Sequence, residues 1–445
     1  MAMSKMRREV TTPPEFGVFS SRIIQSSIEE DLNTDLRPAT APDTKSVIEF
    51  NFTTDEKEYL RLNKTKLYLR MKISITKGGS GSVILDDWKN ISVCNNLLNS
   101  MFKQVEFWIG DRLVDPPHQT YPYKTYFEKI FGKSNDVKRT SAALGFWTEN
   151  ISNDPETLIS DFSEMIKPFP NATELSEGRE FELVGKIHLP MFEQRLDLLG
   201  GCKLKIKLIP NDPSFYIKCN DKVRVKKIDI TECYLTLKGV KVSPTIVGIH
   251  ESTLNVENAR YFLLDNYVIP HTINQGSQDI SLDNLHDGIT PDRLFVAFVD
   301  HQAFNGVHNL NPYNFQNFGV NYLQLYKNGT PVGLPKTPNF KKGWYSNEYF
   351  DLFEVTNQDS VDTCITITKD QFTKGFNIFS FRIQPDLVTG GAKQLGYLNP
   401  IKTSNIRLHL RFDEPLKKTI TALIFFNYDQ MLQLTKTRSV IYDHS

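Results

Sequence analysis

Two histidines in one short polar segment come nearest to a catalytic or metal-binding pattern. His301 and His308 stand in the sequence DHQAFNGVHN, and Asp300 precedes the first of them. Imidazole and carboxylate groups together can bind a metal ion or form an acid–base pair. The segment lacks the HxH with a downstream glutamate that metal-binding jelly rolls use, and no HExxH is present. We therefore expect hydrogen-bonded loop histidines, with no metal and no other cofactor.

The common catalytic motifs are absent from the rest of the sequence. It contains no GxSxG, no GxxxxGKS/T and no GxGxxG, which removes the simplest arguments for a hydrolase, a phosphate-binding loop or a dinucleotide site. A pair of glycosidase carboxylates would sit on different strands and leaves no sequence pattern. We expect a protein that is not an enzyme. A carbohydrate-binding or glycan-hydrolysing β-sandwich protein is the alternative.

Length and composition indicate a large, turn-rich, near-neutral protein. With 445 residues the chain is long enough for two domains, and its 24 Gly and 23 Pro are typical of strands joined by turns. Lys and Arg together number 52, as do Asp and Glu, so no overall charge attracts nucleic acid or an anionic membrane. A neutral surface also permits many copies to pack closely.

The cysteines and the N-terminal sequence bear on the compartment. The five cysteines are widely spaced and form no CxxC, which favours a reducing compartment over a disulfide framework. The N-terminal sequence MAMSKMRREV has no apolar signal region, and no run of about 18 apolar residues occurs. We expect a protein made inside the cell, without a transmembrane segment and not secreted.

Alternating apolar residues predict strands through most of the chain. Residues 66–76 and 203–209 alternate apolar and polar side chains, which indicates strands with one buried face. Residues 102–114 read as a strand followed by a Gly110-Asp111 hairpin turn. The aromatic segment YPYKTYFEKIF, residues 121–131, instead predicts a helix.

Four blocks of the first half recur in the second half in the same order. The offset falls smoothly along the chain, as expected if loops differ in length while a core is retained. The matched blocks are Leu67–Lys72 with Leu294–Val299 (offset 227), Val105 and Phe107 with Leu323 and Leu325 (218), Leu204, Ile206 and Leu208 with Ile406, Leu408 and Leu410 (202), and Lys226-Lys227 with Lys417-Lys418 (191). A period near 200 residues indicates a duplicated domain, because solenoid repeats are far shorter.

The predicted fold class is all-β, with two tandem antiparallel jelly-roll β-sandwiches carrying helical and loop insertions. Residues 1–46 have little periodicity and are expected to form an extended, mobile N-terminal arm. Residues 47–244 are expected to form the first jelly roll, with an insertion at 115–178, and residues 245–445 the second, with an insertion at about 333–374. Insertions of this length are usually functional surface, so we expect these two to make contacts between subunits.

Several motifs resemble one protein family. FKQVEFWIGDRLV, YPYKTYFEKIFG and LPMFEQRLDLLGGCKLKIKLIPNDPSF are similar to blocks of the double jelly-roll, hexon-like major capsid proteins of Polinton/Maverick elements and adintoviruses. HQAFNGVHNLNPYNF resembles the AFNG and NP-aromatic-NF pattern of that family. The residues that carry this last pattern are Ala303, Phe304, Asn305, Gly306, Asn311, Pro312 and Phe315.

The resemblance implies a structural protein of a virion. It implies homotrimers that form pseudo-hexagonal capsomers, which tile an icosahedral capsid around double-stranded DNA. The implied partners are further copies of the chain, a penton protein and minor capsid proteins, without sequence-specific nucleic acid binding. A host-domesticated copy of such a gene, with a changed role, would have the same sequence features.

Overall fold

Each half of the chain forms two antiparallel sheets that face each other across an apolar core. The computed structural model describes residues 25–77, 83, 85–115, 118–147, 178–219, 223–359, 365–385, 399–400 and 402–442. In the first half, one sheet has the strand order β1-β11-β4-β8 with β3 on β11, and the other has the order β2-β9-β6-β7. The bounds are β1 Ile28–Leu36, β2 Ile48–Thr53, β3 Glu58–Leu60, β4 Lys66–Lys77, β6 Phe102–Ile109, β7 Arg112–Leu113, β8 Arg179–Gly185, β9 Lys203–Pro210 and β11 Val223–Val242; β5 Ile91–Val93 pairs with β10 Ile217–Cys219.

The second half repeats this strand order. Its sheets are β12-β19-β14-β17, with β20 on β19, and β13-β18-β15-β16. The bounds are β12 Ala259–Ile273, β13 Asp279–Ile289, β14 Arg293–Asp300, β15 Val320–Lys327, β16 Thr330–Lys336, β17 Ile378–Arg382, β18 Thr403–Phe412, β19 Ile420–Leu434 and β20 Val440–Tyr442. Two antiparallel sheets packed in this way form a jelly roll, so the predicted fold class of two tandem jelly-roll sandwiches is confirmed.

The register of the strand pairs agrees with the duplication at the matched blocks. When the offset of each strand is added to the two residue numbers of a pair in the first sandwich, the following three pairs give a pair of the second sandwich. Val105 lies opposite Leu208 where Leu323 lies opposite Leu410, Phe107 opposite Ile206 where Leu325 lies opposite Leu408, and Leu67 opposite Leu235 where Leu294 lies opposite Phe426. A one-residue slip would turn every apolar side chain to the wrong face, so this agreement reflects a shared core.

The two matched hairpins turn with residues that accept positive φ. Gly110 has φ +59° between β6 and β7, and Asn328 and Gly329 have φ +50° and +78° between β15 and β16. Such angles give the turn a twist that suits the flanking strands. The predicted turn at Gly110-Asp111 is confirmed, and its counterpart in the second half is Asn328-Gly329.

Part of the expected N-terminal arm is a strand of the first sandwich. Strand β1 pairs with β11 from Ile28↔Val242 to Leu36↔Leu235, and it occupies the position that β12 has in the second sandwich. Its sequence IEEDLNTDL is mostly exposed, and only Ile28, Leu32 and Leu36 are half-buried. Acidic residues suit an edge strand because they disfavour pairing with another chain, but they hide the strand alternation. The prediction of an arm was wrong for this stretch, and residues 1–24 lie outside the described residues.

The helices of the described residues lie in the connections between strands. They are α1 Leu97–Ser100, α2 Tyr121–Gly132, α3 Asn135–Arg139, α6 Pro190–Glu193, α7 Pro213–Tyr216, α8 Pro244–Thr253, α9 His301–Asn305, α10 Ser346–Thr356 and α11 Lys369–Thr373, with 3₁₀ turns at Leu62–Lys64, Leu85–Asn90, Ala143–Gly145 and Phe340–Lys342. The helix predicted at 121–131 is confirmed as α2. The second expected insertion, about 333–374, begins inside β16 and so starts later than predicted. Residues 116–117, 148–177 and 360–364 of the two insertions lie outside the described residues.

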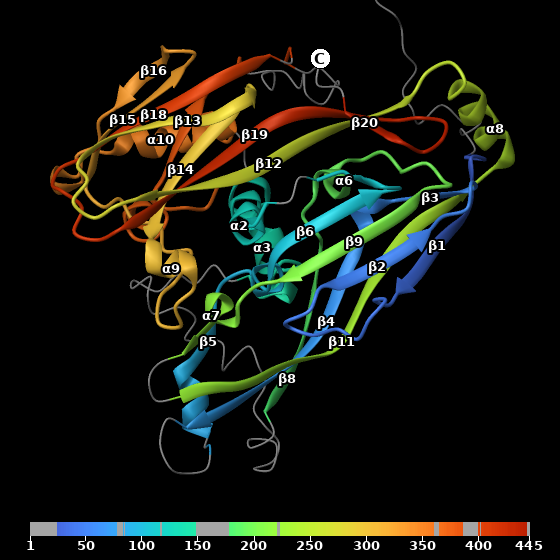
Figure 1. Cartoon of the computed structure of the whole chain (residues 1–445), viewed down its shortest axis with the longest axis horizontal. Helices are drawn as coiled ribbons and strands as arrows, with labels where there is room; N and C mark the ends of the chain where they lie inside the picture. The colour runs from blue at the N-terminus through green and yellow to red at the C-terminus, as the bar shows by residue number, and fades with distance from the viewer. Residues whose placement is uncertain are drawn as a thin grey trace, which may run out of the picture.

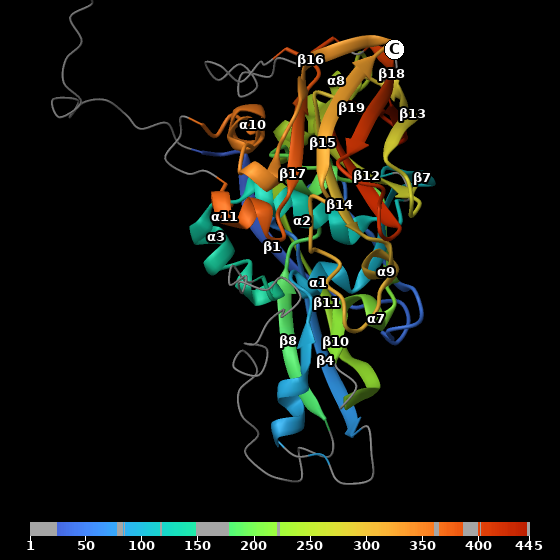
Figure 2. The ribbon, with the colours of Figure 1, turned by 90° about the vertical axis from the view of Figure 1, so that its left-hand side faces the viewer.

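The two sandwiches lie side by side with α2 between them. Figure 1 shows the second sandwich at upper left, the first at lower right and α2 in the middle, and Figure 2 shows the first sandwich extending below α2 at right angles to that view. One apolar cluster fills the first sandwich and continues through this seam, and a second cluster lies between the sheets of the second sandwich. Among the described helices, none is long and apolar enough to cross a membrane.

Strand β14 contributes to both clusters. Its sequence alternates between Leu294, Val296 and Phe298, which face the second sandwich, and Phe295, Ala297 and Val299, which face the seam. This explains why the segment LFVAFV is apolar on both faces. A sheet with two buried faces therefore marks the place where the sandwiches meet.

Candidate functional site

Helix α2 is the central element of the seam, because almost all of its side chains are buried. Phe127 and Phe131 face the second sandwich, where the ring of Phe131 lies 4.3 Å from that of Phe295 and the ring of Phe127 lies 5.2 Å from that of Phe425, measured between centroids. We expected the insertion that contains α2 to make contacts between subunits. That expectation was wrong for α2, because an apolar helix surface of this size is buried within its own chain.

The loop with the AFNG pattern packs three rings onto three rings of α2. Phe304 stacks on Tyr123 at 5.6 Å, Tyr313 on Tyr126 at 4.1 Å, and Phe315 on Phe127 at 5.3 Å between ring centroids. The α2 rings share one face because residues three and four positions apart are neighbours on a helix. Each such pair contributes about 0.5–1.5 kcal/mol beyond burial of its area. We call these six residues the aromatic seam.

The other residues of the pattern shape the loop. Ala303, Asn311 and Pro312 are buried, and the side chain of Asn311 accepts a hydrogen bond from the backbone N–H of Tyr313 at 2.8 Å. Gly306 has φ +84°, and a Cβ there would lie 3.1 Å from the Cα of Phe215 in α7. Glycine is thus needed both for the backbone angle and for the close approach. Asn305 is exposed.

The same loop is hydrogen-bonded to the first sandwich. The backbone N–H of Cys219 donates to the carbonyl of His308 at 3.1 Å, and Nδ1 of His308 lies 2.9 Å from the carbonyl oxygen of Ile217. The ammonium of Lys218 donates to the carbonyl of Val307 at 3.1 Å. Rings and hydrogen bonds together make this loop a clamp between the sandwiches.

The two histidines of the loop have separate partners. Nδ1 of His301 lies 2.9 Å from Oγ1 of Thr421 in β19, whereas His308 bonds to β10. Asp300 caps α9 by accepting from the backbone N–H of Gln302 at 2.9 Å. Within the described part of the chain, no group of three or more His, Cys, Asp or Glu side chains is placed to hold a metal ion.

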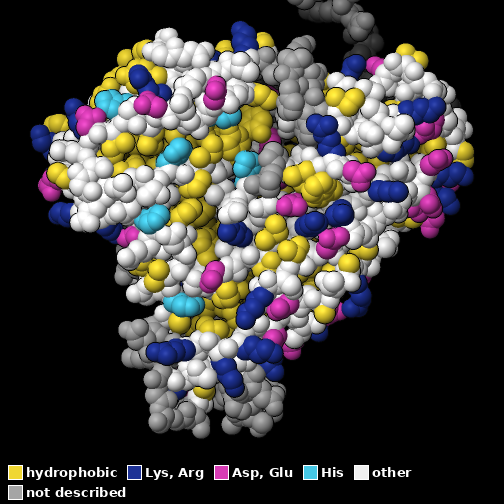
Figure 3. All heavy atoms as spheres, in the orientation of Figure 1, with side chains coloured by type: hydrophobic (Ala, Val, Ile, Leu, Met, Phe, Trp, Pro, Cys, Tyr) yellow, Lys and Arg dark blue, Asp and Glu magenta, His cyan; other side chains and the backbone are white. Residues whose placement is uncertain are grey.

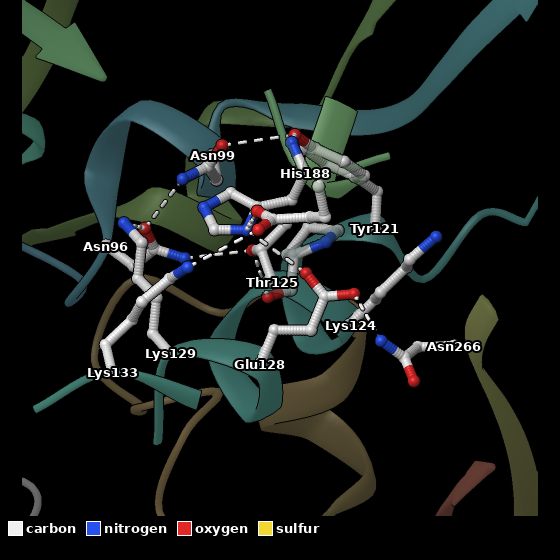
Figure 4. A network of polar contacts seen from close by, with 12 residues as sticks. Asn96, Asn99, Tyr121, Lys124, Thr125, Glu128, Lys129, Lys133, His188 and Asn266 are labelled. Carbon is white, nitrogen blue, oxygen red and sulfur yellow. Dashed lines mark hydrogen bonds and ion pairs between the residues drawn. The ribbon is translucent and has the colours of Figure 1, made fainter. Parts of the chain in front are cut away.

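Buried polar side chains of α2 form a network with residues of both halves of the chain (Figure 4). The ammonium of Lys124 lies 3.6 Å from Asp115 and 3.8 Å from Asp265 of β12. The carboxylate of Glu128 lies 3.1 Å from Nδ1 of His188 and accepts from the side-chain amide of Asn266 in β12 at 2.9 Å. Lys124 and Glu128 thus connect the helix to both sandwiches. Buried charges are tolerated only when paired in this way.

Lysine 129 forms a second branch of the network. Its ammonium donates to Oδ1 of Asn96 at 2.5 Å and lies 5.7 Å from the ring of Trp147. The side-chain amide of Asn99 donates to the same Oδ1 at 2.9 Å, and the hydroxyl of Tyr121 donates to Oδ1 of Asn99 at 3.1 Å. This branch anchors α2 to α1.

Burial and neighbouring charges shift the pKa values of these groups. Burial raises the pKa of Asp115 to about 7, although Lys124 opposes the shift. Burial lowers the pKa of Lys129 to about 7, and Lys133 adds to the effect. For Lys124 burial acts to lower the pKa, but the carboxylates of Asp115, Asp265 and Glu128 outweigh it and the net shift is upward.

A cavity of about 260 Å³ opens beside the network. Glu128 and Glu193 both line it, together with Phe131, Phe295 and Phe425. Two carboxylates and aromatic rings are what the hydrolytic alternative requires.

However, a glycosidase acid needs a raised pKa. Burial acts to raise the pKa of Glu128, but the hydrogen bond from His188 and the charge of Lys124 outweigh it, so the net shift is downward. Glu193 is paired with Lys133 at 3.4 Å. Glu128 and Glu193 are therefore better suited to hold the elements around α2 together than to act as a glycosidase pair.

Sequence reasoning missed the polar network and found the loop. Lys124 and Glu128 belong to no recognisable motif, because their partners Asp265 and Asn266 lie far along the chain. A usable signal was the composition of α2, whose aromatic residues leave no polar face wide enough for solvent.

The duplicated sandwiches and the clamp between them define a double jelly-roll protein. Solved structures with this architecture include viral major capsid proteins. The chain matches the mavirus major capsid protein with a TM-score of 0.56 at 11% identity, covering 100% of this chain and 97% of that one. It matches a chain of the Sputnik virophage with a TM-score of 0.58 at 13% identity, covering 100% and 93%. It also matches the Faustovirus major capsid protein with a TM-score of 0.53 at 8% identity, covering 94% and 92%.

One curated relative aligns with most of the chain. It is an uncharacterized protein of Caenorhabditis elegans, 23% identical over 405 residues, which cover 89% of this chain and 93% of that protein. No protein-family model matches the chain.

Proposed function

We propose that this protein is a major capsid protein without enzymatic activity. Three copies form a pseudo-hexagonal capsomer, and capsomers tile an icosahedral shell around double-stranded DNA. The observation that carries the proposal is the pair of sandwiches with the same strand order, clamped side by side by α2 and the AFNG loop. Three such chains present six similar units, which fill a roughly hexagonal tile under threefold symmetry.

Two exposed apolar patches support self-association. Leu334 in β16, Phe350 in α10 and Trp344 in the loop between them have exposed fractions of 88%, 56% and 67%, and we call them the β16–α10 patch. Ile249 in α8 and Val256 after it are also exposed, and we call them the α8 patch. Figure 1 places β16 and α8 at opposite ends of the long axis. A ring of three copies needs two different surfaces that meet head to tail, and these patches are suitable candidates.

The proposal includes further assignments. The pattern loop from Ala303 to Phe315 serves to hold the two jelly rolls in fixed relation, and the boundary between the jelly rolls falls at residues 244–245, where α8 begins. The protein resides in the virion, with penton and minor capsid proteins as partners, and belongs to the Polinton/Maverick and adintovirus type. The motif resemblance supports this type, and the shared double jelly-roll fold supports the capsid role.

The test is the mass of the purified protein in solution. Native mass spectrometry is expected to give three copies of the 51.1-kDa chain, and negative-stain electron microscopy threefold particles. The double variant Trp344→Glu, Leu334→Glu introduces two negative charges into the β16–α10 patch. It should yield monomers, because unpaired charge in an apolar interface is costly. Leu196→Glu, at an exposed leucine outside both patches and both insertions, should remain trimeric. Monomers of the unmodified protein at all concentrations would refute the proposal.

A further inference from the structure

A groove crosses the seam between the two sandwiches next to α9. Its volume is about 720 Å³, within the range of about 300–1,000 Å³ that is typical of ligand sites. On the face shown in Figure 3, hydrophobic side chains gather along the seam between the two lobes. The apolar wall of the groove consists of Pro122, Tyr123, Pro210, Pro213, Phe215, Pro270 and Phe304.

Four polar side chains of the groove have no partner within the described residues. They belong to Lys45, Lys103, Gln119 and Asn305, which line the groove and are exposed, and none of these side chains has a hydrogen-bond or ion-pair partner there. Asp212, the acidic residue of the lining, is already bound to the backbone N–H of Ser214 at 2.8 Å. The groove therefore offers two free ammonium groups and two free amides beside an apolar wall.

The aromatic rings of the wall are already stacked within the protein. Tyr123 has Phe304 on one face at 5.6 Å and meets Phe215 edge-on at 5.7 Å. Nucleic acid bases bind single-strand sites by stacking on open ring faces along a basic groove, and two lysines are too few for such a groove. Prolines and ring edges instead form the kind of apolar surface on which extended peptides pack their side chains.

We propose that this groove binds an extended acidic peptide segment of a partner protein. Proline or aromatic side chains of the peptide pack on the apolar wall, and its carboxylates pair with Lys45 and Lys103. Gln119 and Asn305 carry both donors and acceptors, so they can bond to the peptide backbone from the two sandwiches. A bound peptide would therefore connect the sandwiches across the seam. All groove residues come from one chain, so this inference holds independently of trimer formation.

The test uses the purified full-length chain and two pools of short peptides. Both pools vary proline, phenylalanine and tyrosine at central positions, and one has Asp and Glu at its ends while the other has Lys and Arg. Affinity selection read by mass spectrometry is expected to enrich peptides from the acidic pool. Fluorescence anisotropy of an enriched peptide should show about tenfold weaker binding to the double variant Lys45→Glu, Lys103→Glu, because each partly exposed ion pair contributes up to about 1 kcal/mol.

The control is Lys203→Glu. Lys203 is exposed at the first residue of strand β9, whereas Pro210 of the groove is the last residue of that strand. This variant should bind the peptide as the unmodified protein does. Circular dichroism checks that the surface variants are folded. Equal enrichment from both pools, no enrichment from the acidic pool, or unchanged binding by the double variant would overturn the proposal. So would a labelled single-stranded DNA that binds in the same assay and is lost in the double variant. The mass measurement described above reports on trimers separately.

Discussion

Lysine 129 provides a sharp test of the buried network, through the variant Lys129→Met. Methionine keeps the length of the side chain and removes the ammonium. The side-chain oxygen Oδ1 of Asn96, which accepts from Lys129, also accepts from the side-chain amide of Asn99, so it is not left without a donor. The variant therefore removes a buried charge while retaining most of the packing around Trp147.

The expected effect depends on pH, with a defined sign. Burial lowers the pKa of Lys129 from 10.5 to about 7 in the folded protein. Between these values the unfolded chain binds a proton that the folded chain does not, so the stability from this group is present at high pH and is lost as the pH falls toward 7. At about 1.4 kcal/mol per pH unit, the free energy of unfolding should rise by about 2 kcal/mol between pH 7 and 9 in the unmodified protein. In Lys129→Met this rise should be missing.

Urea denaturation followed by tryptophan fluorescence, at several pH values from 7 to 9, measures the effect as a difference between the two proteins. Other titrations cancel in that difference, including those of buried cysteines such as Cys94, whose pKa burial raises to about 11. Lys203→Met, at an exposed lysine, should retain the pH dependence of the unmodified protein. If Lys129→Met and the unmodified protein gain the same stability from pH 7 to 9, burial does not lower the pKa of Lys129 and the reasoning fails.

Two further predictions concern the clamp and the matched strands. Gly306→Ala should lower the melting temperature more than Gly276→Ala, since both glycines have φ +84° but only at Gly306 would a Cβ meet a backbone, that of Phe215 at 3.1 Å; equal effects would show that the close approach is unimportant. Ile206→Asp and Leu408→Asp should each abolish folding, because both side chains are fully buried and a buried unpaired carboxylate is costly. Lys205→Ala and Arg407→Ala should fold normally, and equal soluble expression of all four variants would contradict the assignment of inward and outward faces.

The strands and the duplication were predictable from the sequence. Alternation of side chains along a strand depends only on local geometry, so Leu204, Ile206 and Leu208 indicate a buried face without knowledge of their partners. The falling offsets then aligned the two halves correctly, as the pairing of Val105 with Leu208 and of Leu323 with Leu410 confirms. Strand β1 was missed, since an edge strand rich in acidic residues lacks that alternation.

By itself, the sequence determined the strand content, the two hairpin turns, helix α2 and the match between halves, because local backbone preferences and periodicity govern these features. Only the tertiary structure decided which residues contact α2 and that it joins the two sandwiches. Lys124 and Glu128 would be ordinary surface residues on an isolated helix, and they become a buried clamp because β12 brings Asp265 and Asn266 to them. The groove beside α9 likewise exists only where two sandwiches meet, so no local pattern could have indicated it.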